Sequence, residues 1–147
     1  MQEAEHSTLA DRPSILFVCT GNTCRSVIAE YLARRRFSHE VSVESAGLNP
    51  QQPEDASNAI ETLREMFHID ALGHVPRDVR SLNLEAYTYI IAMHKSVARE
   101  LSMLTKREIT VWKIDDPWGD DLLKYRKCAR KIMEHIDSLS QSWRRGV

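Results

Sequence analysis

The chain has 147 residues, 42% of them hydrophobic and 28% charged, which fits one globular domain with a core of its own. The net charge of −1 argues against a surface that binds nucleic acid or an anionic membrane, so any anion site has to be built locally. No apolar run is long enough to span a bilayer, and the polar first dozen residues lack the apolar core of a signal peptide. Three cysteines cannot all pair within the chain, which favours reduced thiols and a cytoplasmic location.

Domain organisation is simple. We expect a disordered N-terminal tail over residues 1–12, one domain over residues 13–142 and a short C-terminal tail over residues 143–147. No internal repeat or low-complexity segment divides the chain.

Short apolar runs alternate with amphipathic helical patterns along the chain. The runs predict four strands, at residues 15–18, 41–45, 89–93 and 109–114. Helical spacing predicts a first helix with Ser26 as its N-cap, then helices over 53–67 and 96–104, and a long helix that includes 125–139.

This alternation predicts an α/β fold with a single domain. We expect a three-layer sandwich of Rossmann-like or flavodoxin-like topology, in which a four-stranded parallel sheet carries helices on both faces. Ligands in such sheets bind at the carboxyl ends of the strands. The loop after residues 15–18 and Asp116, after the last strand, both fall at that edge, so we expect them to converge.

The loop Cys19-Thr20-Gly21-Asn22-Thr23-Cys24-Arg25-Ser26 follows the first strand directly. Its thiol could act as a nucleophile, its guanidinium could hold two phosphate oxygens, and its backbone N–H groups precede a helix. The pattern favours phosphate-ester hydrolysis through a phosphocysteine, with Cys19 as nucleophile and Arg25 as phosphate binder. The alternative reading of Cys19 is a small core residue, which is what most free cysteines are.

Asp116 is the candidate general acid and base. Release of an alkoxide or phenoxide needs a proton donor, and the second step needs a base for water. An Asp-Pro pair after the last strand can supply both, although such pairs are also common turn starters. Asp115 and Asp120 are the nearby alternatives.

Together these residues resemble the low-molecular-weight protein-tyrosine phosphatase family from Ile15 to about Leu139. The matching segments are Val18 to Ser26, Ala29-Glu30, Ser45-Ala46-Gly47, His74, Arg77 and Asp116-Pro117-Trp118.

The resemblance implies a two-step mechanism that needs neither metal nor cofactor. Cys19 attacks phosphorus, while Arg25 and the loop amides hold the phosphoryl oxygens. Asp116 protonates the leaving group and then helps water to cleave the thiophosphate. Phosphate or substrate contacts are implied for Thr20, Gly21, Asn22, Thr23, Cys24, Ser26 and Trp118, and His74 is implied to brace Asn22.

Three positions depart from the family pattern. Val27 stands where a proline is usual, His94 where many members have an acidic residue, and Trp118 in place of tyrosine or phenylalanine. The Trp118 side chain is expected to wall the leaving-group pocket, or else simply to pack.

Thr23 bears on the substrate. Phosphotyrosine members usually have a bulky aliphatic residue here, whereas the protein-arginine phosphatases of the family resemble this chain in the whole Cys-Thr-Gly-Asn-Thr-Cys-Arg-Ser loop. Since threonine here does not exclude a tyrosine-directed member, we expect a phosphorylated protein as substrate, with phosphotyrosine ahead of phosphoarginine, and no nucleic-acid or membrane partner. A monomer or a weak homodimer is expected.

Two other functions stay open. Arsenate reductases share the start of the loop, but they need a later cysteine pair, and only Cys128 follows, on the apolar stripe of a predicted helix. A phosphate-binding module without catalysis remains if Asp116 does not reach the loop. A separate hypothesis is that a Cys19–Cys24 disulfide protects the nucleophile reversibly from oxidation. Six scattered histidines give no paired metal-ligand spacing.

Overall fold

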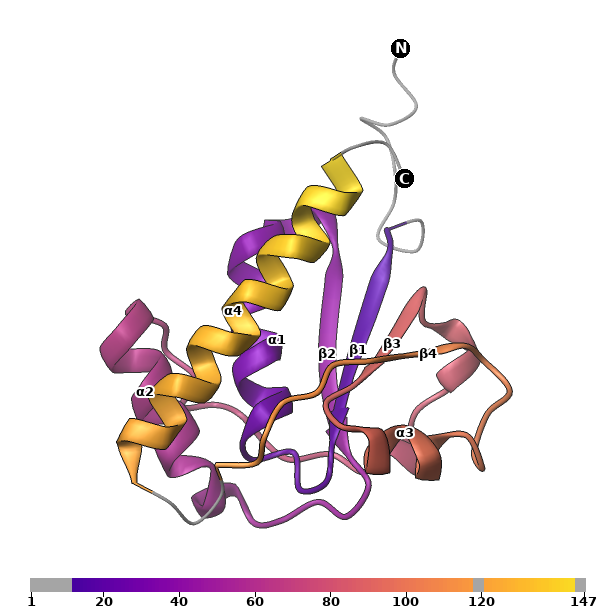
Figure 1. Ribbon diagram of the computed structural model, residues 1–147. Helices are drawn as coiled ribbons and strands as arrows, with labels where there is room; N and C mark the ends of the chain where they lie inside the picture. Colours follow the sequence, from indigo (N-terminus) through magenta and orange to yellow (C-terminus); the bar gives the residue numbers. More distant parts are fainter. Residues whose placement is uncertain (1–11, 118–120, 145–147) are drawn as a thin grey trace.

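The computed structural model describes residues 12–117 and 121–144 (Figure 1). Its sheet has the strand order β2-β1-β3-β4, and each neighbouring pair is parallel. The strands are β1 (Ser14–Cys19), β2 (Ser42–Gly47), β3 (Tyr89–Ala92) and β4 (Ile109–Val111). The α-helices are α1 (Arg25–Phe37), α2 (Ser57–Phe67), α3 (Lys95–Leu101) and α4 (Leu122–Arg144). The predicted α/β fold with a four-stranded parallel sheet is therefore confirmed.

Strand β1 divides the core into two parts because its side chains alternate between the two faces of the sheet. Ile15 and Phe17 pack with α1, α2 and α4 on one face, and Leu16 and Val18 pack on the other face with α3 and the short turns near residues 79–86. All four side chains have no exposed surface, as expected for a central parallel strand. Figure 1 shows α1, α2 and α4 on one side of the sheet and α3 on the other.

The fourth strand is shorter than predicted. Strand β4 ends at Val111, but the chain stays bonded to the end of β3 beyond that point. The amide of Trp112 donates to Ala92 O over 2.8 Å, and the amide of Ile114 donates to Met93 O over 3.2 Å. These two bonds carry the segment that contains Asp116 toward the carboxyl end of β1.

The start of α1 corrects one prediction. The helix begins at Arg25 with Cys24 as its N-cap, so Ser26 is not the cap and lies inside the first turn. The reason is that Asn22 takes a left-handed conformation, with φ of 57°, and the chain turns into the helix before Ser26. The Ser26 hydroxyl is then available to the loop.

Two residues that the prediction placed in the tails contact the rest of the chain. Arg12, placed in the N-terminal tail, donates a hydrogen bond to His39 O. Helix α4 continues to Arg144, and the Trp143 ring packs against Phe37 and Tyr89 at centroid distances of 5.0 and 5.3 Å. Within the described residues, no helix is both long enough and apolar enough to cross a membrane.

Candidate active site

Asn22 ties the loop of residues 19–26 to two other parts of the chain. Its side-chain amide donates to Ser26 Oγ over 2.8 Å and to Ser45 Oγ over 2.9 Å, and its Oδ1 accepts from the amide of Arg77 over 2.9 Å. His74 Nε2 donates to the backbone carbonyl oxygen of Asn22 over 2.8 Å. The buried Asn22 is thus bonded on all sides, which holds its left-handed backbone in place.

The Cys19 thiol lies at the end of β1 with a hydroxyl beside it. Ser26 Oγ is 2.9 Å from Cys19 Sγ, and both side chains are buried. Because Ser26 already accepts a proton from the Asn22 amide, its own hydroxyl proton can point at the sulfur. A hydroxyl at this distance can stabilise negative charge on the sulfur during a reaction.

A buried carboxylate stands at the far end of this chain of bonds. Glu30, only 4% exposed, accepts from Ser45 Oγ over 2.5 Å, and Ser45 accepts in turn from Asn22. The sequence of contacts therefore runs from Glu30 through Ser45, Asn22 and Ser26 to Cys19. Sequence reasoning did not assign Glu30 or Ser45 a part in the site, although both lie in segments that carry the family resemblance.

Arg25 brings the loop and the segment after β4 together. Its guanidinium is buried, donates from Nη1 to Ile114 O over 3.0 Å and has Nη2 3.6 Å from Asp116 Oδ2. The predicted convergence of the two segments is confirmed. Arg25 Nε is buried and has no hydrogen-bond partner among the described residues. An orphaned donor on a fixed guanidinium is suited to an anionic oxygen.

These groups surround a cavity of about 150 Å³, which we call the reaction cavity. Its lining residues are Cys19, Thr20, Gly21, Thr23, Cys24, Arg25, Gln51 and Asp116. The cavity therefore combines a thiol, an arginine and a carboxylate that is about half exposed, with its side chain 49% accessible. Asn22, Ser26 and His74 do not line the cavity, and their hydrogen bonds hold the loop in shape.

Gln51 is a lining residue that the sequence analysis missed. Its side-chain Oε1 accepts from Thr23 Oγ1 over 2.5 Å, and its backbone N–H donates to Gly21 O over 3.0 Å. Gln51 follows β2, so the rule that ligands bind at the carboxyl ends of parallel strands could have indicated it. Its side chain decides whether the Thr23 hydroxyl is engaged or open to a substrate.

The other two thiols are held in their neutral form. Burial raises the pKa of Cys24 to about 11, and its Sγ lies 3.1 Å from the hydroxyl of Tyr125. Burial also raises the pKa of Cys128 to about 12 and raises the pKa of Tyr125 well above its usual range. Cys128 is part of the core cluster under α4, where the sequence pattern placed it. Neither thiol is activated at neutral pH.

Three predicted positions complete the picture. Trp118 lies outside the described residues. Val27 is fully buried in the core cluster of α1, and His94 caps α3, where its Nδ1 accepts from the amide of Ser96 over 3.3 Å. Val27, in place of the usual proline, thus packs in the core, and His94, in place of an acidic residue, caps a helix.

Comparison with known proteins decides the family. The model of the family "Low molecular weight phosphotyrosine protein phosphatase" matches residues 14–147. The chain belongs to this family.

Its relatives differ in activity. A low-molecular-weight protein tyrosine phosphatase from T. tengcongensis has a solved structure that is 29% identical, covers 88% of this chain and 99% of its own, and has a TM-score of 0.82. A protein-arginine-phosphatase from Geobacillus stearothermophilus is 30% identical over 86% of this chain and 93% of its own length. A glutaredoxin arsenate reductase from Synechocystis sp. is 25% identical over 85% of this chain and 94% of its own. The family assignment therefore covers cysteine-dependent phosphatases and reductases.

Proposed function

We propose that the protein is a protein-tyrosine phosphatase that works through a phosphocysteine intermediate. The observation that carries the proposal is the meeting of Cys19, Arg25 and Asp116 around one cavity of about 150 Å³. A phosphate-binding module would need the arginine and the loop amides, but it would not need a carboxylate in the same cavity as the thiol. The proximity of Asp116 therefore favours catalysis over binding alone.

In the first step the Cys19 thiolate attacks phosphorus and the bond to the leaving oxygen breaks. Asp116 gives its proton to that oxygen. Arg25 and the backbone N–H groups of residues 20–25 hold the equatorial oxygens and balance their charge in the transition state. The Arg25 bond to Ile114 O fixes the guanidinium before substrate arrives, which reduces the cost of ordering it.

In the second step Asp116, now a carboxylate, takes a proton from water. The hydroxide oxygen attacks phosphorus, the sulfur–phosphorus bond breaks, and inorganic phosphate and the Cys19 thiolate are released. Ser26 Oγ, 2.9 Å from the sulfur, stabilises the negative charge that returns to it.

The test is turnover of p-nitrophenyl phosphate and of a phosphotyrosine peptide by the purified chain. We expect hydrolysis by the wild type, loss of turnover in Cys19→Ser and a phosphorylated cysteine in acid-quenched wild type by mass spectrometry. Phosphate binding without turnover would contradict the proposed phosphatase activity and would favour a phosphate-binding module instead.

A second candidate is a protein-arginine phosphatase on the same site. The Thr23 hydroxyl, which lines the reaction cavity and bonds to Gln51, favours it because a hydroxyl can bond a guanidinium leaving group or place the attacking water. A side-by-side measurement of kcat/KM on phosphotyrosine and phosphoarginine peptides decides between them. We expect the higher value for phosphotyrosine.

Arsenate reduction is the weaker alternative. After one cysteine has reacted, that chemistry needs a relay of thiols, whereas Cys24 and Cys128 are buried and their pKa values are raised to about 11 and 12.

All three cysteines are free, which favours a reducing compartment such as the cytoplasm.

A further inference from the structure

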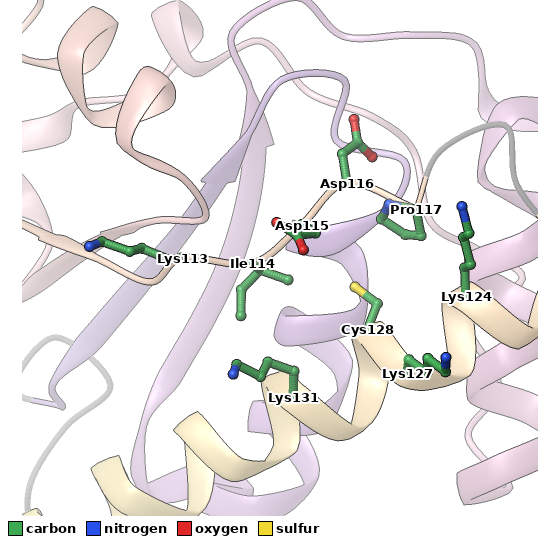
Figure 2. Close-up of a pocket in the computed structure, with 9 residues that line it drawn as sticks. All are labelled: Lys113, Ile114, Asp115, Asp116, Pro117, Lys124, Lys127, Cys128 and Lys131. Carbon is green, nitrogen blue, oxygen red and sulfur yellow. The ribbon is translucent and has the colours of Figure 1, made fainter.

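A second and larger cavity lies next to the reaction cavity (Figure 2). Its volume is about 430 Å³, and it lies between the segment 113–117 and one side of α4. We call it the lysine cavity because four lysines line it: Lys113, Lys124, Lys127 and Lys131. Nothing in the proposed mechanism uses these residues.

The lysines on α4 form a stripe. Lys124, Lys127, Cys128 and Lys131 follow one another at the spacing that puts side chains on one helix face. A stripe that faces the rest of a protein is normally apolar. Here only Cys128 is buried, and the lysines around it are exposed. Figure 2 shows this side of α4 facing the segment that contains Asp115 and Asp116.

The charge of the cavity is not balanced from within. Leaving Lys124 aside, three lysines, Lys113, Lys127 and Lys131, line the cavity with two aspartates, Asp115 and Asp116, in a chain whose net charge is −1. Asp116 is already close to Arg25, and no ion pair between described residues involves Lys113, Lys127 or Lys131. The lysine cavity is thus a local positive site on a chain that is slightly negative overall.

Asp116 lines both cavities. A phosphoryl group over Cys19 puts its leaving oxygen near Asp116, so one direction of the attached polypeptide leads into the lysine cavity. Because an extended chain advances about 3.3–3.6 Å per residue, the residues that reach it are the first few beside the phosphorylated one.

We propose that the lysine cavity binds acidic side chains that flank the phosphorylated residue of the substrate protein. The proposal rests on the proposed phosphatase function and defines its substrate class: phosphorylated sites in acidic segments. Exposed charge pairs are screened by salt, so the preference is largest at low ionic strength.

The experiment compares two peptides that differ only in glutamate or alanine at the three positions on each side of the phosphorylated residue. The peptides carry phosphotyrosine, or phosphoarginine if the wild type hydrolyses only that. For the wild type we expect kcat/KM to be about two- to tenfold higher on the acidic peptide, since each exposed ion pair contributes little. The preference falls to about onefold in Lys127→Glu/Lys131→Glu and is weaker for the wild type in 0.5 M salt than at low salt.

The matched control is Arg99→Glu/Lys106→Glu, which also reverses two exposed charges, at residues that do not line the cavity, and it should keep the wild-type peptide preference. Equal rates on the two peptides with wild type would overturn the lysine-cavity proposal while leaving the phosphatase intact. The lysine-cavity proposal also fails if Lys127→Glu/Lys131→Glu keeps the preference. No turnover of any phosphorylated peptide or of p-nitrophenyl phosphate would instead overturn the proposed function itself.

Discussion

Ser26 Oγ lies 2.9 Å from Cys19 Sγ, at the end of a chain of hydrogen bonds that starts at the buried Glu30. Glu30 accepts from Ser45, and the Asn22 amide then donates to both Ser45 and Ser26. Because Ser26 Oγ accepts from Asn22, its single hydroxyl proton is available to the sulfur.

Ser26→Ala should therefore lower kcat/KM on p-nitrophenyl phosphate by about 10- to 100-fold, since a hydrogen bond to a charged group contributes roughly 1.5–3 kcal/mol. The rate of Cys19 alkylation by iodoacetamide at pH 7 should fall as well, because the sulfur loses the hydroxyl that stabilises its negative charge. Ser140→Ala removes another buried hydroxyl, which accepts from Arg36 Nε over 3.3 Å outside the site, and it serves as the control. Equal losses in both variants would mean that Ser26 acts only through stability.

The Asp116 carboxylate should matter most for poor leaving groups. Asp116→Asn is expected to lower kcat about 10²- to 10³-fold on a phenyl phosphate and less on p-nitrophenyl phosphate, whose leaving oxygen needs less help from an acid. Asp115→Asn tests the neighbouring carboxylate, which lines the lysine cavity rather than the reaction cavity. If the change at Asp115 costs as much as the change at Asp116, the assignment of the acid is wrong.

Thr23→Ile should shift the ratio of kcat/KM for phosphoarginine to that for phosphotyrosine toward phosphotyrosine, because the substitution removes the hydroxyl from the reaction cavity. Gln51→Leu is the informative partner variant. It breaks the 2.5 Å bond between Thr23 Oγ1 and Gln51 but leaves the hydroxyl in place. A ratio that stays constant in Thr23→Ile would show that the residue only fills space.

Disulfide formation between Cys19 and Cys24 should be slow at neutral pH. Peroxide converts the Cys19 thiolate to a sulfenic acid, and the Cys24 thiolate must then attack that sulfur and release hydroxide. Burial holds the pKa of Cys24 at about 11, so the attacking thiolate is scarce at pH 7 and increases as the pH rises. The disulfide yield by mass spectrometry should be several-fold higher at pH 9.5 than at pH 7 after the same brief exposure.

Recovery of activity by dithiothreitol should follow that yield and be lost in Cys24→Ser. The Tyr125 hydroxyl lowers the pKa of Cys24, so Tyr125→Phe should slow disulfide formation further. Recovery that is equal in the wild type and in Cys24→Ser would remove Cys24 from the redox response.

Gly47 and Gly21 respond to a methyl group differently. A Cβ at Gly47 would lie 2.7 Å from Thr20 O and 2.9 Å from Asn22 N, which are backbone atoms of the loop. The three atoms nearest to a Cβ at Gly21 belong to the Gln51 side chain, at 2.5 to 2.9 Å, and a flexible side chain can move aside. Gly47→Ala should therefore lower the free energy of unfolding by about 1–3 kcal/mol, whereas Gly21→Ala costs less. Urea denaturation of both variants measures the difference, and equal costs would show that the loop yields freely.

The sequence was sufficient for the fold because strands and helices alternate strictly, and because β1 is apolar on both faces. It also predicted that Asp116 would meet the loop, since both follow parallel strands. The role of Ser26 could not be read in this way. A serine before a helical pattern is normally a cap, and only the left-handed turn at Asn22 moves the start of α1 ahead of it.

Gln51, Glu30 and Tyr125 escaped the sequence analysis for a different reason. Each is linked to the site by a side-chain hydrogen bond to a residue 15 to 101 positions away, and no local periodicity marks such contacts. Only Gln51, which follows β2, could have been indicated by the rule on the carboxyl ends of strands. The lysine stripe on α4 is regular in the sequence. It lines a cavity only because the folded chain places residues 113–117 opposite it, and no local pattern predicts that placement.

The segment between β4 and Asp116 is anchored at both ends. Trp112 and Ile114 donate to the end of β3, and the Ile114 carbonyl accepts from Arg25. Within residues 112–115 a changed side chain leaves these backbone hydrogen bonds in place. One inserted or deleted residue would break their register and move Asp116 away from the reaction cavity. The family chemistry at this point should thus tolerate variation in composition far better than variation in length.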